Sequence, residues 1–180
     1  IILHTKYDKI ADKSFLIMSV DPHNVVAIDL GTTTSSIARL NNNGTIEQIT
    51  DRVFNQSDCI PSVVCYKQNK TLVGFNALRE ERKSPMDVIY DAKRMLGHQY
   101  DDEIIQKLYK KWLFKISKAD DGSILIETCQ GPKHPWEVCS EIIKFLKENA
   151  ESKAMGHKIT HAVVSIPANY NSTQRKETIM

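Results

Sequence analysis

The stretch that most constrains the fold of this chain is VVAIDLGTTTSSIARL, which runs from Val25 to Leu40. Its first six residues are apolar except for Asp29, a pattern typical of a strand that is buried on both faces. Gly31 then allows a tight turn because it has no Cβ atom. Residues 35–40 resume a strand-like pattern. The whole stretch therefore predicts a β-hairpin.

The turn of this hairpin carries groups suited to a phosphate and its metal ion. A buried carboxylate is costly unless it is paired or meets a metal, so we expect Asp29 to lie where the strand reaches a site. Thr32, Thr33 and Thr34 supply three hydroxyls and three backbone N–H groups in a row. A carboxylate beside such donors suits a magnesium–phosphate group. The chain has no GxxxxGK[ST] or GxGxxG loop, and the alternative is an ordinary hairpin with a polar turn.

Three segments resemble the 70 kDa heat-shock chaperones, which belong to the actin-like ATPase superfamily. IDLGTTTS, at the hairpin, resembles the first phosphate motif of that family. IYDAKRMLGHQYDDEIIQ, from Ile89 to Gln106, resembles the segment around its catalytic lysine. KITHAVVSIPANYNSTQRKET, from Lys158 to Thr178, resembles a later strand, a hinge proline and the following helix. The segments keep the family's order and about its spacing, so the resemblance covers the chain from about Val25 onwards.

The resemblance implies roles for individual residues at the nucleotide. Lys93 matches the family's catalytic lysine, which reaches the terminal phosphate and helps to place the attacking water. A compact ammonium can act as a point charge and a water holder at once. Asp29 matches the aspartate that holds waters of the Mg²⁺ ion. The residues that would meet the phosphates are Gly31, Thr32, Thr33 and Thr34. Taken alone, Lys93 would be an ordinary solvated lysine.

Two more residues are implied in signalling the nucleotide state to other parts of a chaperone. Pro167 matches the hinge proline and Arg175 matches a relay arginine, both associated with the substrate-binding domain and with J-domain co-chaperones. The alternatives are a strand-terminating proline and a surface arginine. The chain departs from the family at Asn169, where a tyrosine is usual. Because asparagine cannot replace the packing of an aromatic ring, we expect weaker coupling at the hinge.

Composition argues against several other classes of function. The net charge of +2 gives no case for nucleic acid or an acidic membrane surface. The four cysteines form no CxxC pair and no metal-type cluster, which favours free thiols in a reducing compartment and does not support a zinc site. No apolar run approaches the ~20 residues that a membrane helix needs. Since no targeting signal is present, we expect a cytoplasmic protein.

Apolar periodicity and turn residues predict the other elements. Strands are expected over 45–50, 61–66, 72–74, 112–117, 123–130 and 159–166, the last being a second buried strand. Helices are expected over 76–82, 91–96, 101–110 and 135–155, and from 173 onwards. Asn76, Asp101, and Asn171 or Ser172 are the expected N-caps. The clearest helix begins at Pro135 and ends at Gly156, and its apolar stripe is expected to be core.

The pattern belongs to the α/β class. The resemblance implies the first lobe of an actin-like (ribonuclease H-like) ATPase domain, a mixed sheet with helices and a smaller α+β subdomain. We expect residues 24–180 to form this N-terminal lobe, incomplete at its C-terminus, with roughly 61–129 as the smaller subdomain. Residues 1–23 are expected to be a disordered or artefactual extension, because they begin with Ile1 and fit no targeting peptide.

The implied function is that of an ATP-dependent chaperone in protein folding and the stress response. The full-length protein would be an ATPase that binds ATP or ADP with Mg²⁺, whereas the isolated piece would be inactive. Implied partners are unfolded peptide clients, J-domain co-chaperones and nucleotide-exchange factors, with no nucleic acid and no membrane. Two alternatives remain. One is another kinase of the superfamily, against which DAKRMLG and IPANYN argue; the other is a truncated, non-enzymatic module that binds co-chaperones.

Overall fold

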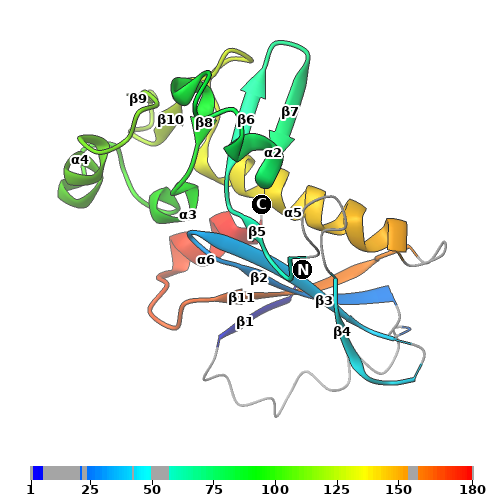
Figure 1. Ribbon diagram of the computed structural model, residues 1–180. Helices are drawn as coiled ribbons and strands as arrows, with labels where there is room; N and C mark the ends of the chain where they lie inside the picture. Colours follow the sequence, from blue (N-terminus) through cyan, green and yellow to red (C-terminus); the bar gives the residue numbers. More distant parts are fainter. Residues whose placement is uncertain are drawn as a thin grey trace.

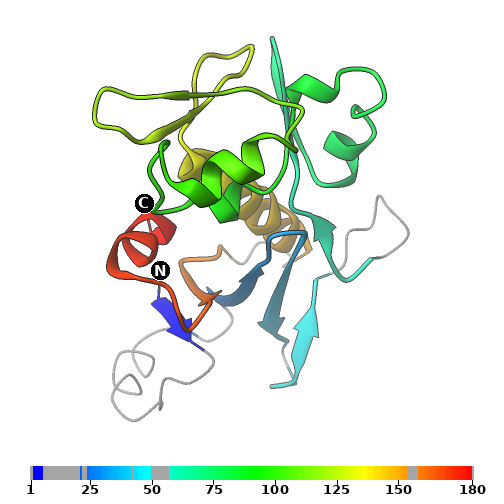
Figure 2. The same cartoon turned by 90° about the vertical axis from the view of Figure 1, so that its left-hand side faces the viewer.

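A computed structural model describes residues 2–5, 21, 24–41, 43–49, 57–153 and 158–179. A long helix, α5 (Pro135–Lys153), lies across one face of the main sheet (Figure 1). Two small sheets lie on the far side of this helix, and Figure 2 shows the same layers from the side. The described part of the chain is therefore layered as main sheet, helix and small sheets.

The main sheet has six strands and mixes parallel with antiparallel pairs. Its order is β1 (Ile2–Thr5), β11 (His161–Ile166), β2 (Val25–Leu30), β3 (Thr34–Leu40) and β4 (Ile46–Gln48), with β5 (Ile60–Pro61) paired to β3. Strands β1, β11 and β2 are parallel to one another, whereas β3 is antiparallel to β2, β4 and β5. This confirms the predicted mixed sheet. Strand β1 comes from the expected extension, most of which lies outside the described residues.

Strands β2 and β3 form the predicted hairpin, in which Ile28 pairs with Ile37. The prediction that the first strand is buried on both faces is wrong. Val26, Ile28 and Leu30 are buried, but Ala27 and Asp29 are exposed. Successive side chains of a strand point to opposite faces, and among the described elements α5 covers only the face with Ile28.

Strand β11, the second predicted buried strand, alternates in the same way. Val164 and Ile166 are buried, whereas His161 and Ser165 are exposed. The open face of β11 therefore continues the open face of β2, with Ser165 paired in register with Asp29. This shared face brings two polar side chains from distant parts of the chain together.

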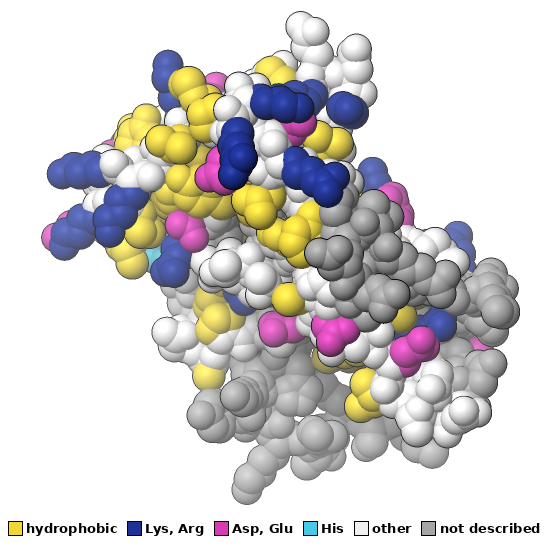
Figure 3. All heavy atoms as spheres, in the orientation of Figure 1, with side chains coloured by type: hydrophobic (Ala, Val, Ile, Leu, Met, Phe, Trp, Pro, Cys, Tyr) yellow, Lys and Arg dark blue, Asp and Glu magenta, His cyan; other side chains and the backbone are white. Residues whose placement is uncertain are grey.

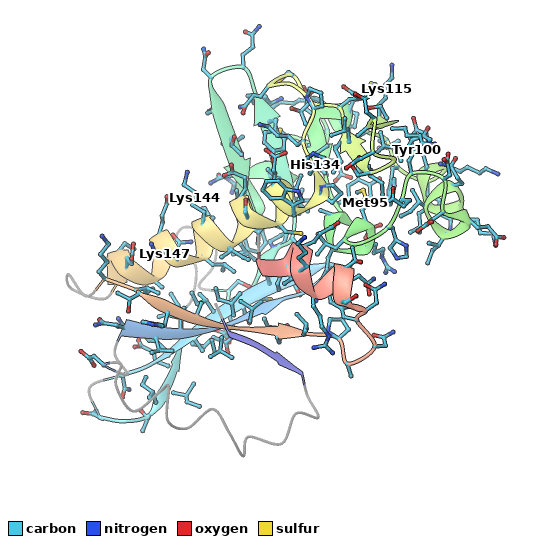
Figure 4. All side chains as sticks on the ribbon, turned by 180° about the vertical axis from the view of Figure 1, so that it is seen from behind. Met95, Tyr100, Lys115, His134, Lys144 and Lys147 are labelled. Carbon is cyan, nitrogen blue, oxygen red and sulfur yellow. The ribbon has the colours of Figure 1, made fainter. Side chains whose placement is uncertain are left out.

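Helix α5 confirms the predicted apolar stripe. Its buried residues recur at helical spacing: Val138, Cys139, Ile142, Leu146 and Ala150. Lys144 points away from the main sheet on the opposite side of the helix (Figure 4). The Glu137 side chain accepts a hydrogen bond of 2.7 Å from the backbone N–H of His134, which is half of a capping box. The predicted end of the helix, Gly156, lies outside the described residues.

Along the chain, the two small antiparallel sheets come between β5 of the main sheet and α5. One has the order β7–β6–β8 and the other pairs β9 with β10. Their bounds are β6 (Val64–Lys67), β7 (Lys70–Val73), β8 (Val88–Ile89), β9 (Ile116–Lys118) and β10 (Ile124–Ile126). The single strand predicted over 61–66 is therefore wrong. Pro61 ends β5 in the main sheet and β6 belongs to a small sheet, and between them Ser62 bonds back to the β2–β3 turn through its N–H and its hydroxyl.

The four shorter helices predicted from the sequence are present with shifted ends, and the described residues also contain a 3₁₀ helix that was not predicted. They are α2 (Phe75–Leu78), the 3₁₀ helix η2 (Pro85–Asp87), α3 (Ala92–Met95), α4 (Glu103–Tyr109) and α6 (Ser172–Ile179). The predicted N-caps Asn76 and Asp101 are wrong: Gly74 and Asp102 occupy these positions without side-chain capping bonds. Asn171 does cap α6, because its side chain accepts from the N–H of Gln174, whose side chain in turn accepts from the N–H of Asn171.

One hydrophobic core joins the layers through α5. It contains Ile28 of the main sheet, Ile142 of α5 and Ile126 of the small sheet. Trp112 and Phe114 stack within it with their ring centroids 5.4 Å apart. Lys and Arg side chains surround apolar ones on the surface of the small-sheet region (Figure 3). The core therefore fixes the small sheets and α3 relative to the end of β2.

This core gives a first prediction. Ile142 is 2% exposed, so Ile142→Ala should lower the free energy of unfolding by about 2–5 kcal/mol, since it removes buried methyl groups and leaves a cavity. Lys144→Ala, on the exposed side of the same helix, should change it by less than about 0.5 kcal/mol. Urea unfolding of the chain followed by tryptophan fluorescence measures both. Equal effects of the two substitutions would contradict the assignment of the buried stripe.

Candidate functional site

The tip of the β2–β3 hairpin is a tight turn that depends on Gly31. A Cβ atom at this position would lie 2.0 Å from the carbonyl oxygen of Thr34. No side chain can occupy that space unless the turn itself shifts. Glycine is therefore required here because the backbone of Thr34 comes so close to residue 31. The sequence predicted a tight turn at this glycine.

Two buried serines hold the turn on its inner side, which faces the rest of the protein. The Ser62 hydroxyl donates to the carbonyl of Gly31 at 2.8 Å, and its oxygen lies 2.8 Å from that of Ser35. The backbone N–H of Ser62 donates to the carbonyl of Thr33, also at 2.8 Å. Ser35 and Ser62 are 1% and 5% exposed. Because buried hydrogen bonds are costly to break, these contacts fix the backbone of the turn.

The outer side of the turn presents its donors to solvent. Thr33 and Thr34 are exposed, and Thr32 is half-buried. Within the described residues, the backbone N–H groups of Thr32 and Thr33 have no backbone acceptor. Unpaired N–H groups in a fixed turn form a concave site for an anion. The local structure thus leaves the predicted phosphate donors available.

Asp29 lies on the open face of the main sheet, one residue before the end of β2. Its side chain accepts a hydrogen bond of 2.6 Å from the hydroxyl of Ser165 on β11. The carboxylate is exposed, so Asp29 lies where β2 reaches the surface, and the neighbouring strand β11 holds it. The contact fixes one carboxylate oxygen and leaves the group next to the hairpin turn.

Lys93 reaches the same place from α3. Its ammonium donates a hydrogen bond to the carbonyl of Leu30, the last residue of β2. Burial lowers the pKa of Lys93 below its usual value, and the nearby Asp29 carboxylate acts in the opposite direction. The structure therefore brings Asp29, the hairpin turn and Lys93 together at the end of β2.

The position of α3 depends on Asp91, the residue before the helix. Asp91 has a φ of 60°, in the left-handed region that aspartate tolerates better than most residues. Its carboxylate accepts from the indole N–H of Trp112 at 3.2 Å and pairs with Arg94 at 3.2 Å. These contacts stabilise the unusual backbone that directs the first turn of α3, and with it Lys93, towards β2.

Pro167 and Arg175, the two predicted coupling residues, meet at Tyr170. The backbone N–H of Tyr170 donates to the carbonyl of Pro167 at 3.1 Å. The Arg175 side chain donates to the carbonyl of Tyr170, also at 3.1 Å. Pro167 and Arg175 are both half-buried. The segment between β11 and α6 is therefore a turn that is held by one hydrogen bond on each side of Tyr170.

Three residues of the site were not predicted from the sequence. Ser62 and Ser165 bond to the hairpin turn and to Asp29, and Tyr170 lies next to Lys93 with its ring centroid 5.9 Å from the ammonium nitrogen. A serine within an apolar run was the available signal for Ser165. For Ser62 the signal was only its place after a strand-ending proline. No local signal indicated Tyr170, because its contact depends on how α3 packs.

Comparison of the sequence with known proteins identifies the family. The family described as Hsp70 protein matches residues 25–179. Chaperone protein DnaK of Psychrobacter cryohalolentis is 36% identical over 154 residues, which are 86% of this chain and 23% of that protein. Heat shock 70-related protein 1, mitochondrial, of Leishmania major is 35% identical over 159 residues, 86% of this chain and 24% of that protein.

The matched part of these relatives is thus about a quarter of their length. The family match begins at Val25, the first residue of β2, and extends to the last described residue of α6. It includes all the segments that carry the hairpin turn, Lys93 and the turn at Tyr170. The chain belongs to the Hsp70 family and corresponds to the N-terminal part of its nucleotide-binding domain.

Proposed function

We propose that the protein that carries this chain is an ATP-dependent chaperone and that this chain provides one side of its Mg-ATP site. The observation that supports this most is the meeting of Lys93, Asp29 and the hairpin turn at the end of β2. A cation, a carboxylate and free N–H donors around one point are the groups that phosphoryl transfer needs for positioning.

In this proposal the hairpin turn binds phosphate oxygens. The N–H groups of Thr32 and Thr33 would donate to them, and the buried contacts of Ser62 would keep these donors in place. The hydroxyls of the threonines would add further hydrogen bonds. Gly31 would let the backbone come close to the nucleotide, since no side chain stands in the way.

The residues present also fit a magnesium ion that arrives with the nucleotide. Within the described residues there is no group of three or more His, Cys, Asp or Glu side chains that could hold a metal alone. The exposed Asp29 carboxylate would instead accept hydrogen bonds from water molecules on the ion, an arrangement common for Mg²⁺. When bound, the ion would offset the negative charge of the phosphates.

Lys93 would act at the terminal phosphate. Its bond to the Leu30 carbonyl holds the ammonium beside the hairpin turn, where it can stabilise negative charge and hold a water molecule. That water would attack the terminal phosphorus as the bond to the leaving ADP breaks, which gives inorganic phosphate. Partial burial strengthens the interaction of the ammonium with a phosphate, because water screens it less.

The wider role of the protein is part of the same proposal. Peptide clients, J-domain co-chaperones and nucleotide-exchange factors are the proposed partners, and residues 24–180, with 61–129 as a smaller subdomain, form the proposed first lobe. No helix within the described ranges is long and apolar enough to cross a membrane. The expected cytoplasmic location stays a prediction, since one of the two relatives is named as mitochondrial.

Lys93→Ala tests the catalytic part of the proposal in the full-length protein. ATP binding should be retained, whereas single-turnover hydrolysis should slow by about 10²–10³-fold, because a preorganised charge at the transition state is lost. Lys110→Ala, which alters an exposed lysine after α4, should leave the rate unchanged. Near-normal hydrolysis by Lys93→Ala would remove Lys93 from the mechanism.

Gly31→Ala tests the phosphate turn. Its new methyl group would clash with the Thr34 carbonyl and displace the N–H donors, so affinity for Mg-ATP should fall about tenfold or more in the full-length protein. The control is Gly44→Ala, at a turn with φ of 74° and open space around it, where only backbone strain is added. Isothermal titration calorimetry measures both. Equal affinities would place the nucleotide elsewhere.

The 180-residue chain alone should bind Mg-ATP weakly. It matches only 23% of the length of DnaK, and the family resemblance implies a second lobe with another phosphate hairpin and the adenosine pocket. Contacts from both sides share a single entropic cost of association, so one side retains little affinity. Calorimetry should give a Kd no tighter than about 1 mM, roughly −4 kcal/mol. A micromolar Kd would indicate a self-contained nucleotide-binding module.

A further inference from the structure

Tyr170 is the aromatic residue that faces Lys93. Its ring centroid lies 5.9 Å from the ammonium nitrogen, within the range of a cation–π contact. Burial raises the pKa of the Tyr170 hydroxyl to about 12, so the ring faces the ammonium as a neutral phenol. Lys93 is therefore held between the carbonyl of Leu30 and the ring of Tyr170.

The neighbouring Asn169 does not share this position. Asn169 is exposed, whereas Tyr170 is half-buried. The turn in which the N–H of Tyr170 donates to Pro167 brings residue 170, and not residue 169, towards α3. The aromatic ring beside Lys93 is therefore that of residue 170.

The backbone of Tyr170 is fixed on both sides. Its N–H bonds to Pro167 and its carbonyl accepts from Arg175. The α6 helix is also tied directly to the end of α3. The Glu177 side chain accepts from the N–H of Gly97 at 2.7 Å, and a Cβ atom at Gly97 would lie 2.8 Å from the backbone nitrogen of Gln174.

We propose that Tyr170 is a positioning residue for Lys93: its ring holds the ammonium against the Leu30 carbonyl. This inference rests on the proposed ATPase function for its kinetic consequence, although the contact itself does not. A ring on one side and a carbonyl on the other restrict the ammonium in two directions.

The first experiment uses the chain itself and no nucleotide. Lys93 is acetylated with a succinimidyl ester at fixed pH, and mass spectrometry compares its labelling rate with that of exposed Lys110 in the same sample. Tyr170→Leu should raise the relative rate at Lys93 several-fold, since the ring that covers the ammonium is lost. Tyr170→Phe, which keeps the ring, and Asn169→Ala should match the parent chain. Should Tyr170→Leu fail to fold by circular dichroism, Tyr170→Met replaces it.

The second experiment measures ATP hydrolysis by the full-length protein. Tyr170→Leu should lower kcat about tenfold with little change in KM, because the ammonium is displaced from where the terminal phosphate reacts. Tyr170→Phe should keep the parental kcat. A merely structural role would alter the two variants alike or raise KM as well.

The two experiments distinguish a failure of the inference about Tyr170 from a failure of the proposed ATPase function. If Tyr170→Leu leaves both labelling and kcat unchanged, or if Tyr170→Phe impairs them equally, the inference about the ring is wrong. If the parent protein shows no hydrolysis, the proposed function fails, whereas the labelling experiment still tests the contact. If Asn169→Ala alters Lys93 as strongly as Tyr170→Leu, residue 169 is the positioning residue and the inference is again wrong.

Discussion

The two carbonyl groups at the end of β2 are the point on which the rest of the structure depends. The carbonyl of Leu30 accepts from Lys93 and that of Gly31 accepts from Ser62. The donors lie 63 and 31 residues away in the sequence. Backbone carbonyl groups beyond the end of a strand lose their ladder partners and need other donors. Here the donors come from α3 and from the segment between β5 and β6. The end of the strand is thereby both a structural junction and a chemical site.

The hairpin could be predicted from the sequence because its signals are local. An apolar run, a glycine and three threonines are enough to place the turn and its N–H donors. The approach of Lys93 to that turn had no local signal, and only the family resemblance indicated it. The packing of α5, β6 and the Trp112 region creates this approach, and none of these contacts is visible as a short-range pattern.

The errors in prediction have the same physical origin. The first strand has five apolar residues out of six, which hides the alternation that places Ala27 and Asp29 on the open face. The break between β5 and β6 depends on Ser62, whose hydrogen bonds reach back to a turn in another part of the chain. Likewise, the contact between Lys93 and the Tyr170 ring depends on the turn between β11 and α6 and on the packing of α3, neither of which has a short-range signal in the sequence.

The central pairing of the main sheet, between β2 and β11, has a consequence for biosynthesis. Asp29 and Ser165 are 136 residues apart in sequence, yet they lie side by side. At the usual 5–20 residues per second, the ribosome makes β11 on the order of ten seconds after β2. During this interval the β2 edge that β11 later covers is unpaired and open to other strands. The nascent chain thus carries an aggregation-prone edge until β11 has been synthesised.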